Sequence, residues 1–568
     1  MKKDILLIDA LIVVLGSLLF FYGIGSVRLF DWDEINFAES AREMLVTGDW
    51  FNVQINFESF WEKPPLFIWM QALSMKVFGI GEFAARFPNA LMGVITLLTL
   101  FHIGLRSEDK RFGILWAGLY CISFLPFFFF KSGIIDPWFN YFIFLGIYFF
   151  SRYADETKSR WAALSGLFTG LAVLTKGPVG FLIFALTFAV WLAVRKFRLN
   201  FRWKDVLVYL AALVLAGGAW FIALALTGHT EVIKDFFEYQ VRLLETKDAG
   251  HGGFLLYHFV ILLFGVTPAS FLALKTFRRK VLADEPESAN KGLFRWMMAS
   301  FWVVLILFTI VRTKIVHYSS FCYFPLTYLG AWAAARMMDG KIRFDWWQKA
   351  LLIGTAAFYG IAFTGLTVFD RFKDKLAPHV ADPFAVSCMD AESSWTGFEP
   401  FVGAFLIGMT VWFCIWFSRR RSLKSCLPVA VGHLVFGMTF LVCAVGEVEK
   451  YSQASAVDFY VERQGEDCYV QPVYYKSYAQ YFYTNRQPQN NCEDLDFLMK
   501  GAVDKPCYFV VKDIPEDVER LQQAAPDAVF MERRPGFRFY VRRPALEAVD
   551  DDIVEHHGTG DELDTGAE

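Results

Sequence analysis

The chain has 568 residues, of which 55% are hydrophobic and 18% aromatic, and its formal net charge is −3. Apolar runs long enough to cross a bilayer recur along it, which excludes a soluble helical protein of this length. No basic patch with interleaved aromatic residues is present, so we expect no nucleic-acid partner.

The first apolar run follows Met1-Lys2-Lys3-Asp4 and extends from Ile5 to about Gly25. It is longer than the apolar core of a signal peptide, and no small-x-small cleavage pattern follows it, so we interpret it as an uncleaved transmembrane helix. A roughly 20-residue criterion predicts about 13 such spans, as in a polytopic α-helical membrane protein. They lie near residues 5–25, 87–105, 112–130, 137–151, 161–175, 178–194, 206–226, 254–274, 294–312, 318–337, 348–369, 400–418 and 426–446.

Basic residues gather in alternate connections between these spans, and with Lys2 and Lys3 they fall on one side of the membrane. The positive-inside rule makes that side cytoplasmic. The other, outer side then holds residues 26–86, 227–253, 370–399 and everything after about 447.

The first outer loop, residues 26–86, begins with an acidic block, Asp31-Trp32-Asp33-Glu34. Acidic residues at the mouth of a membrane bundle are costly to bury and indicate function. From Glu34 to Val46, apolar residues fall near one helical face opposite Glu39 and Glu43, which predicts a helix lying in the interface plane. A second such helix is predicted from Pro64, since proline suits a first helical turn.

The composition changes after Glu447 and predicts a small α/β domain over residues 448–548. Segments Tyr469–Tyr474 and Cys507–Val511 are typical of strands, and Glu516–Ala525 of a polar helix. The tail, residues 549–568, is acidic without Lys or Arg, and we expect it to be disordered.

Four of the nine cysteines lie outside the predicted spans, on the side where disulfides persist. They are Cys388, Cys468, Cys492 and Cys507. We expect one or two bridges among them, with the pairing undetermined. No cysteine and histidine spacing typical of a zinc site is present.

Charged and polar aromatic side chains recur at the outer ends of the spans, where the predicted topology brings them to one membrane face. They are Asp33, Glu34, Arg42, Glu62, Lys63, Lys131, Asp136, Lys176, Glu238, Arg242, Arg312, Lys314, His317 and Tyr318. Cations stabilise a departing phosphate as its charge develops, and a carboxylate can orient or deprotonate an acceptor. This set therefore suits a reaction at an anionic lipid phosphate.

Each of these residues also has a structural interpretation. Asp33 could cap the helix that follows it, with Glu34 complementing the helix dipole. Lys63, before two prolines, could be an interface residue whose aliphatic chain lies against apolar surface while its ammonium stays in water. Lys176 could occupy a turn between two spans, and Asp136 could be a helix N-cap.

Taken together, these residues resemble the polyprenyl-phosphate-dependent GT-C glycosyltransferases, in particular the bacterial lipid A aminoarabinose transferases and their protein O-mannosyltransferase relatives. The matching blocks are Asp33-Glu34, Ala38-Glu39, Ala41–Leu45, Gly48-Asp49-Trp50, Phe60–Leu66, Trp69, Ile135-Asp136-Pro137 and Leu174–Gly177, with Lys314 and Tyr318 later in the chain. The first-loop block is highly specific, whereas the single later residues are not. The resemblance implies a GT-C fold with an external C-terminal domain.

In this family, a sugar passes from an undecaprenyl or dolichyl phosphate carrier to a lipid or protein acceptor, with inversion at the anomeric carbon. The resemblance implies that Asp33 is the principal catalytic carboxylate, accompanied by Glu34 and Asp136. By the same resemblance, Lys63, Lys176, Arg242, Lys314 and Tyr318 would contact the carrier phosphate. Glu62, Arg42 and Tyr239 would shape the sugar and acceptor site.

The chain departs from the aminoarabinose transferases at two positions. They carry a Glu-His pair before the eighth span, and its histidine is associated with a bound metal; here Glu238 is followed by Tyr239. Phe60 stands where the family often has tyrosine. These changes argue against a divalent metal and against aminoarabinose in particular more than against glycosyl transfer. The only other small molecule expected is the polyprenyl-phosphate sugar donor.

The leading hypothesis is an inner-membrane glycosyltransferase that modifies lipid A or a related glycolipid. A protein O-glycosyltransferase is the alternative within the family, since only the acceptor differs. A transporter or lipid flippase would place polar or broken-helix sites near mid-bilayer, often with internal repeats, whereas this chain concentrates charge at one interface. A structural membrane protein with an external binding domain leaves the acidic block unexplained.

Overall fold

The computed structural model describes residues 2–198, 201–245, 253–278 and 289–544, and these form two compact units. The helical unit comprises Met1–Leu29, Ser40–Val368 and Trp395–Val445. The C-terminal unit comprises Phe30–Glu39, Phe369–Ser394 and the chain from Gly446 onward. The segment that carries Asp33 therefore groups with the C-terminal unit.

A helix lies at each position predicted to span the membrane. The helices are α1 (Lys2–Phe21), α4 (Glu82–Ser107), α5 (Lys110–Ile122), α6 (Phe124–Phe129), α7 (Asp136–Glu156), α8 (Ser159–Lys176), α9 (Val179–Val194), α10 (Trp203–Gly217), α11 (Ala219–Leu226), α13 (Tyr257–Gly265), α14 (Ala269–Ala273), α16 (Ala289–Ile310), α17 (Tyr323–Met338), α18 (Trp346–Leu376), α20 (Glu399–Arg420), α21 (Leu427–Thr439) and α22 (Gly446–Lys450). Among the described residues, six helices are long and apolar enough to cross a membrane, or up to eight if each bent pair is one span. The chain is thus a multi-pass membrane protein, and the count of 13 spans stays a prediction.

Several predicted spans are interrupted rather than continuous. Helices α10 and α11 meet at 51°, and α13 and α14 meet at 108° around Thr267-Pro268. Proline lacks the backbone N–H that would continue the helix, which favours a break there. Hydropathy detects the apolar run but not the break within it, because both halves are equally apolar.

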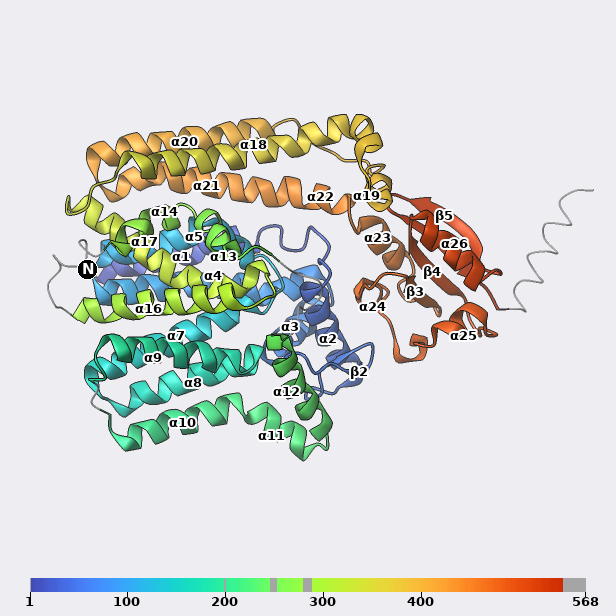
Figure 1. Cartoon of the computed structure of the whole chain (residues 1–568), viewed down its shortest axis with the longest axis horizontal. Coiled ribbons are helices and arrows are strands. Elements are labelled where there is room, and N and C mark those ends of the chain that lie inside the picture. Colours follow the sequence, from blue (N-terminus) through green and yellow to red (C-terminus); the bar gives the residue numbers. More distant parts are fainter. Residues whose placement is uncertain (1, 199–200, 246–252, 279–288, 545–568) are drawn as a thin grey trace, which may run out of the picture. The chain divides into compact units, whose positions relative to one another are not determined.

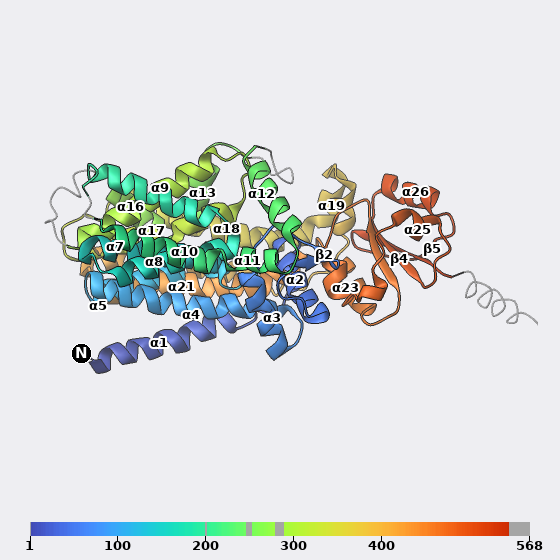
Figure 2. The ribbon, with the colours of Figure 1, turned by 90° about the horizontal axis from the view of Figure 1, so that it is seen from below.

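Helices α7, α8 and α10 lie side by side in the helical unit (Figure 1). Small residues allow this close approach: a Cβ added to Gly166 or Gly170 of α8 would lie 2.2 Å or 2.7 Å from backbone oxygens of α10. Small residues four apart are the usual means by which membrane helices bring their backbones together. Helix α1 lies along α4 at the margin of the bundle (Figure 2) and leaves most of its apolar surface uncovered, as a lipid-facing helix does.

A helix is present at the position predicted from Glu34, and its place in the interface plane stays a prediction. Helix α2 spans Asp33–Thr47, and its polar face is buried too: Glu39, Arg42 and Glu43 are each 0% exposed. The periodicity identifies the apolar stripe, but it does not show that tertiary contacts cover the opposite face. The second predicted helix is present as α3, Leu66–Phe78, directly after Pro64-Pro65.

Glu43 is buried because it holds a β-hairpin. Strands β1 (Gln54–Ile55) and β2 (Glu58–Ser59) are joined by Asn56-Phe57, and both turn residues have positive φ. Their backbone N–H groups donate to the Glu43 carboxylate at 2.6 Å and 2.9 Å. A charged acceptor thus satisfies two donors that the turn cannot pair internally.

The C-terminal unit contains a four-stranded sheet in the order β3-β4-β6-β5. The predicted strands are present as β3 (Tyr469–Val473) and β4 (Cys507–Lys512), which are parallel, and the predicted helix as α26 (Pro515–Ala524). Two strands were not predicted, β5 (Val529–Arg534) and β6 (Phe537–Arg542), and both are antiparallel to their neighbours. Helix α26 and α25 (Leu495–Lys500) cover one face. Residues 549–568, the predicted acidic tail, lie outside the described residues.

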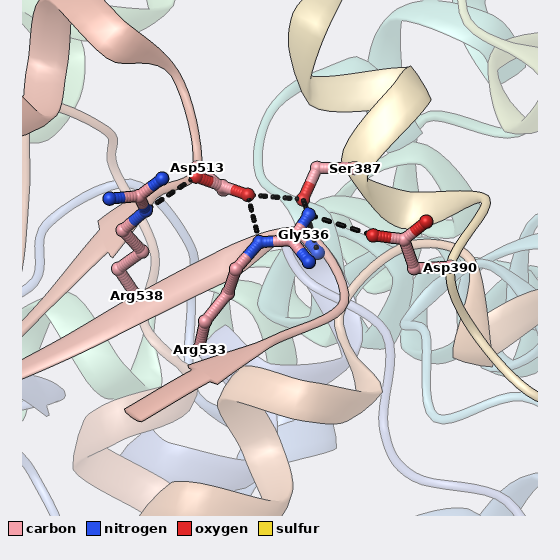
Figure 3. Close-up of polar contacts among 6 residues, drawn as sticks. All are labelled: Ser387, Asp390, Asp513, Arg533, Gly536 and Arg538. Carbon is pink, nitrogen blue, oxygen red and sulfur yellow. Dashed lines mark hydrogen bonds and ion pairs between the residues drawn. The ribbon is translucent and has the colours of Figure 1, made fainter. Parts of the chain in front are cut away.

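A polar network fastens α19 (Pro383–Cys388) and the residues after it to this sheet (Figure 3). The Asp513 carboxylate accepts hydrogen bonds from Ser387 at 2.8 Å, Arg533 at 2.5 Å and Arg538 at 2.6 Å. Arg533 also pairs with Asp390 at 2.7 Å. Three separate stretches of the chain thus meet at one carboxylate.

The predicted disulfides are absent. All nine cysteines are within the described residues, and no two of them are joined by a disulfide. Cys507 lies at the start of β4, fully buried in the core beneath α25 and α26. Burial against apolar side chains is a sufficient role for it, as it is for the cysteines of the spans.

Candidate active site

Asp33 and Glu34 open helix α2, but they are placed differently. Glu34 is 5% exposed, and its Oε2 accepts a hydrogen bond from the backbone N–H of Phe30 at 3.0 Å. Asp33 is the first helical residue and is partly exposed, in the first turn where the helix dipole favours a negative charge. Glu34 therefore holds the chain just before the helix, and Asp33 is the more accessible carboxylate of the pair.

Asp31, which the sequence analysis assigned no role of its own, anchors the start of this segment. The Ser477 hydroxyl donates to its Oδ2 at 2.5 Å, and the Tyr478 backbone N–H donates to both oxygens at 3.3 Å. Burial raises the pKa of Asp31 above its ordinary value, and the two donors and Lys476 oppose that rise. In the sequence, the position of Asp31 in the acidic block is the signal that could have identified it.

Lys176 and Asp136 form a buried ion pair with 2.7 Å between Nζ and Oδ1. Asp136 begins α7 and its side chain is 2% exposed, whereas Lys176 ends α8 and is 14% exposed. The Lys176 ammonium also lies 5.7 Å from the centre of the Tyr318 ring. Three predicted site residues from distant parts of the sequence therefore meet here.

The second carboxylate oxygen of Asp136, Oδ2, is buried and has no hydrogen-bond partner. Such an acceptor costs about 1–3 kcal/mol when it is left unsatisfied. It is therefore poised to accept a hydrogen bond from a hydroxyl of a bound molecule.

A second group surrounds Tyr239 on α12 (Thr230–Glu245). The Tyr239 hydroxyl donates to Glu62 at 3.2 Å, and Lys63 lies 3.8 Å from the same carboxylate. Lys63 and Arg242 lie 5.3 Å and 5.2 Å from the centre of the Tyr239 ring. Two cations thus flank one phenol beside a carboxylate.

The two groups are joined by a shared apolar cluster. Trp61 packs with Leu174 of α8 and Val232 of α12 in one hydrophobic core. Gly177 follows Lys176 with φ near +92°, and a Cβ there would lie 2.9 Å from the Phe236 ring of α12. The glycine therefore lets α12 approach the end of α8, which brings the helix that carries Tyr239 and Arg242 against the turn that follows Lys176.

Two predicted site residues have structural tasks in this conformation. The Lys314 ammonium donates to the backbone oxygens of Phe308, Thr309 and Val311 at 2.6–2.9 Å, so it caps the C-terminus of α16. Arg42 is fully buried and lies 4.0 Å from Glu43. The predicted contribution of Arg42 to the sugar and acceptor site stays a prediction.

At the Glu238-Tyr239 position, a carboxylate and a phenol stand where the aminoarabinose transferases have a Glu-His pair. Glu238 is largely exposed and lies 3.6 Å from Lys234, while the Tyr239 hydroxyl donates a hydrogen bond to Glu62. Across the described ranges, no three His, Cys, Asp or Glu side chains lie close enough together to hold a metal ion. No step of the chemistry below uses one.

Comparisons with known proteins agree on the kind of enzyme. The family of dolichyl-phosphate-mannose-protein mannosyltransferases matches residues 62–225. An uncharacterised protein of Aquifex aeolicus is 29% identical over 57% of this chain and 71% of its own. An undecaprenyl phosphate-alpha-4-amino-4-deoxy-L-arabinose arabinosyl transferase of Pectobacterium carotovorum is 27% identical over 67% of this chain and 68% of its own.

The crystal structure of ArnT from Cupriavidus metallidurans bound to undecaprenyl phosphate superimposes with a TM-score of 0.73, at 18% identity, over 94% of this chain and 98% of that one. The chain therefore has the fold of ArnT and resembles glycosyltransferases that use polyprenyl-phosphate-linked sugars. The family match begins at Glu62, so it contains Lys63, Asp136 and Lys176 but not Asp33.

Proposed function

We propose that this glycosyltransferase moves a sugar from an undecaprenyl or related polyprenyl phosphate carrier to lipid A or a related glycolipid. The observation that carries the proposal is the Lys176–Asp136 pair with its unsatisfied Asp136 oxygen. The Lys176 ammonium suits a departing phosphate, and the Asp136 carboxylate suits a sugar hydroxyl. The names of the relatives support the same carrier.

The chemistry is a direct displacement at the anomeric carbon. The acceptor oxygen forms a bond to that carbon while the bond to the carrier phosphate breaks, and the electron pair leaves with the phosphate oxygen. Lys176, Lys63 and Arg242 stabilise the charge that develops on the phosphate. Holding two lipid-anchored reactants together accounts for a large part of the rate gain.

Asp33 has one of two tasks, depending on the acceptor. An acceptor hydroxyl must lose its proton, and Asp33 then takes it as a general base. An acceptor phosphate is already ionised, and Asp33 then orients it. A hydroxyl acceptor would therefore need Asp33 as a base, whereas a phosphate acceptor would not.

The test uses purified full-length protein in liposomes with a polyprenyl-phosphate sugar and lipid A. Asp33→Asn should abolish transfer while the melting temperature stays unchanged, and Glu58→Gln, at an exposed position of the hairpin, is the matched control. Uptake of donor into sealed vesicles without a covalent product would contradict the proposal and favour a transporter.

The family match to protein mannosyltransferases makes a protein acceptor the second candidate. Mass spectrometry of lipid A and of membrane proteins from cells with and without this chain separates the two acceptors. A sugar missing only from protein would overturn the glycolipid assignment.

We further propose that the active site and the C-terminal domain face the periplasm of the inner membrane. The alternating basic loops support this orientation. An alkaline phosphatase fused after residue 544 should be active, since that enzyme needs an oxidising compartment. An inactive fusion in folded protein would reverse the topology.

A further inference from the structure

We propose that a tyrosine-lined groove in the C-terminal unit binds the phosphorylated sugar headgroup of the acceptor glycolipid. The groove lies at the end of β3 and along α24 (Ala479–Tyr483), and its volume is about 430 Å³. Tyr474, Tyr478 and Tyr481 line it, together with Lys476. This inference rests on the proposed function and adds a place for the acceptor.

Aromatic rings give the groove the character of a sugar site. Tyrosine offers a flat apolar face for the C–H groups of a sugar ring and a hydroxyl for its polar edge. Next to the groove, Trp32 is 45% exposed and its ring meets that of Tyr478 at 5.7 Å. Trp32 therefore offers a further aromatic face beside the three tyrosines.

Each of the three tyrosines also carries a cation on its ring. Arg520 lies 4.3 Å from the centre of Tyr474, Lys476 lies 5.1 Å from that of Tyr478, and Arg486 lies 4.5 Å from that of Tyr481. Lys476 is exposed and also lies 5.2 Å from the Trp32 ring. Lys476 is the cation among the residues that line the groove, and its exposed ammonium favours an anionic headgroup over a neutral sugar.

Gln480 adds an independent sign of a missing ligand. It lines the groove, is 1% exposed, and its Nε2 donates to the Ser477 backbone oxygen at 3.0 Å. Its Oε1 has no hydrogen-bond partner. A buried acceptor without a donor is uncommon, and a hydroxyl or amino group of a sugar would satisfy it.

The groove is coupled to the acidic block through its own residues. Ser477 and Tyr478 line it, and these two donate to Asp31, two residues before Asp33. A headgroup held there would lie against the segment that presents the proposed catalytic carboxylate. The acceptor would thus be recognised by the same unit that orients Asp33.

The binding test uses the full chain in phosphatidylcholine nanodiscs and a glucosamine disaccharide bearing two phosphates. Binding is followed by tryptophan fluorescence, with the unphosphorylated disaccharide and inorganic phosphate as comparison probes. Lys476→Gln should raise the Kd at least tenfold, and Lys476→Arg should restore most of the affinity. Lys500→Gln, an exposed lysine 65% open to solvent in the same unit, should leave it unchanged.

A second variant guards against misfolding. Tyr478→Ala removes the ring but keeps the backbone N–H that Asp31 accepts, so the segment before α2 stays anchored. In transfer assays, both variants should raise the KM for lipid A at least fivefold and leave the KM for the donor unchanged. Wild-type affinity in both variants, or equally tight binding of inorganic phosphate, would overturn the groove assignment.

The two proposals fail in different ways. Transfer to lipid A that both variants leave unaffected would refute the groove and keep the function. Binding of the bisphosphorylated disaccharide that depends on Lys476, in a protein that transfers no sugar to lipid A, would support the groove and refute the proposed acceptor reaction.

Discussion

The Lys176–Asp136 pair shows what burial does to a charged residue at a membrane interface. With Asp136 2% exposed, neither charge keeps its full hydration, so each depends on the other. Removing one partner of such a pair costs about 3–5 kcal/mol, because the remaining charge is left without compensation. The pair is therefore both a structural element and a candidate for substrate contact.

A double-mutant cycle separates these two roles. Lys176→Met should lower the melting temperature in detergent, and adding Asp136→Asn should restore much of it, since no lone buried charge then remains. Transfer should remain at least 100-fold reduced in the double variant if the charges act on substrate. Recovery of activity together with stability would show that the pair is only structural.

Tyr239 is a more local case. Its hydroxyl donates to Glu62, and its ring lies beside two cations. Tyr239→Phe removes one hydrogen bond worth about 1 kcal/mol and keeps the ring, so kcat/KM should fall roughly fivefold.

A chelator should leave sugar transfer unchanged in both the wild type and Tyr239→Phe. Loss of wild-type activity with EDTA, restored by a divalent cation, would contradict this prediction.

At the level of single elements, α2 and the hairpin that follows it form one structural unit. Glu43 connects them, since its carboxylate accepts both turn N–H groups. Arg42 and Glu39 of the same helix are buried as well.

Glu43→Gln should therefore loosen the hairpin. An amide presents only one acceptor oxygen to two donors, and losing a hydrogen bond to a charged group costs about 1.5–3 kcal/mol. Hydrogen exchange over residues 50–60 should speed up, and the melting temperature should fall. Glu58→Gln is the control on the same hairpin, because that side chain is exposed and should leave the exchange unchanged.

At the scale of the whole molecule, the C-terminal unit is assembled from segments far apart in sequence. The Asp513 network joins the residues after α18 to strands near the end of the chain (Figure 3). Burial by itself would raise the pKa of Asp513, but hydrogen bonds from Arg533, Ser387 and Arg538 outweigh it and hold the pKa below its ordinary value of 3.8.

This depressed pKa makes stability depend on pH. A carboxyl group with a lowered folded-state pKa contributes stability that is complete above its ordinary value of 3.8 and is lost as the pH falls through the folded-state value. The melting temperature of the wild-type chain should therefore fall when the pH is lowered below about 4. Asp513→Asn should have a lower melting temperature than the wild type at pH 7, and its melting temperature should change less as the pH falls.

The matched control is Asp496→Asn, whose side chain is 85% exposed. This substitution should leave both the melting temperature and its pH dependence as in the wild type. Equal acid sensitivity in the Asp513 and Asp496 variants would show that the network does not stabilise the unit.

The sequence by itself determined the membrane class, the positions of the helices, the strands at Tyr469–Val473 and Cys507–Lys512, and the specific first-loop block. Apolar length, residue periodicity and local motifs record these features directly in neighbouring residues. Strands β5 and β6 escaped prediction because β5 is largely exposed and carries several charges, so it lacks an apolar alternation.

Only the tertiary structure decided that Lys176 meets Asp136 and that Asp31 is held by Ser477 and Tyr478. These are contacts between residues up to several hundred positions apart, and no local pattern encodes which partner a buried charge will find. Burial makes the choice, because a charge removed from water must be paired by whatever group the fold brings within reach.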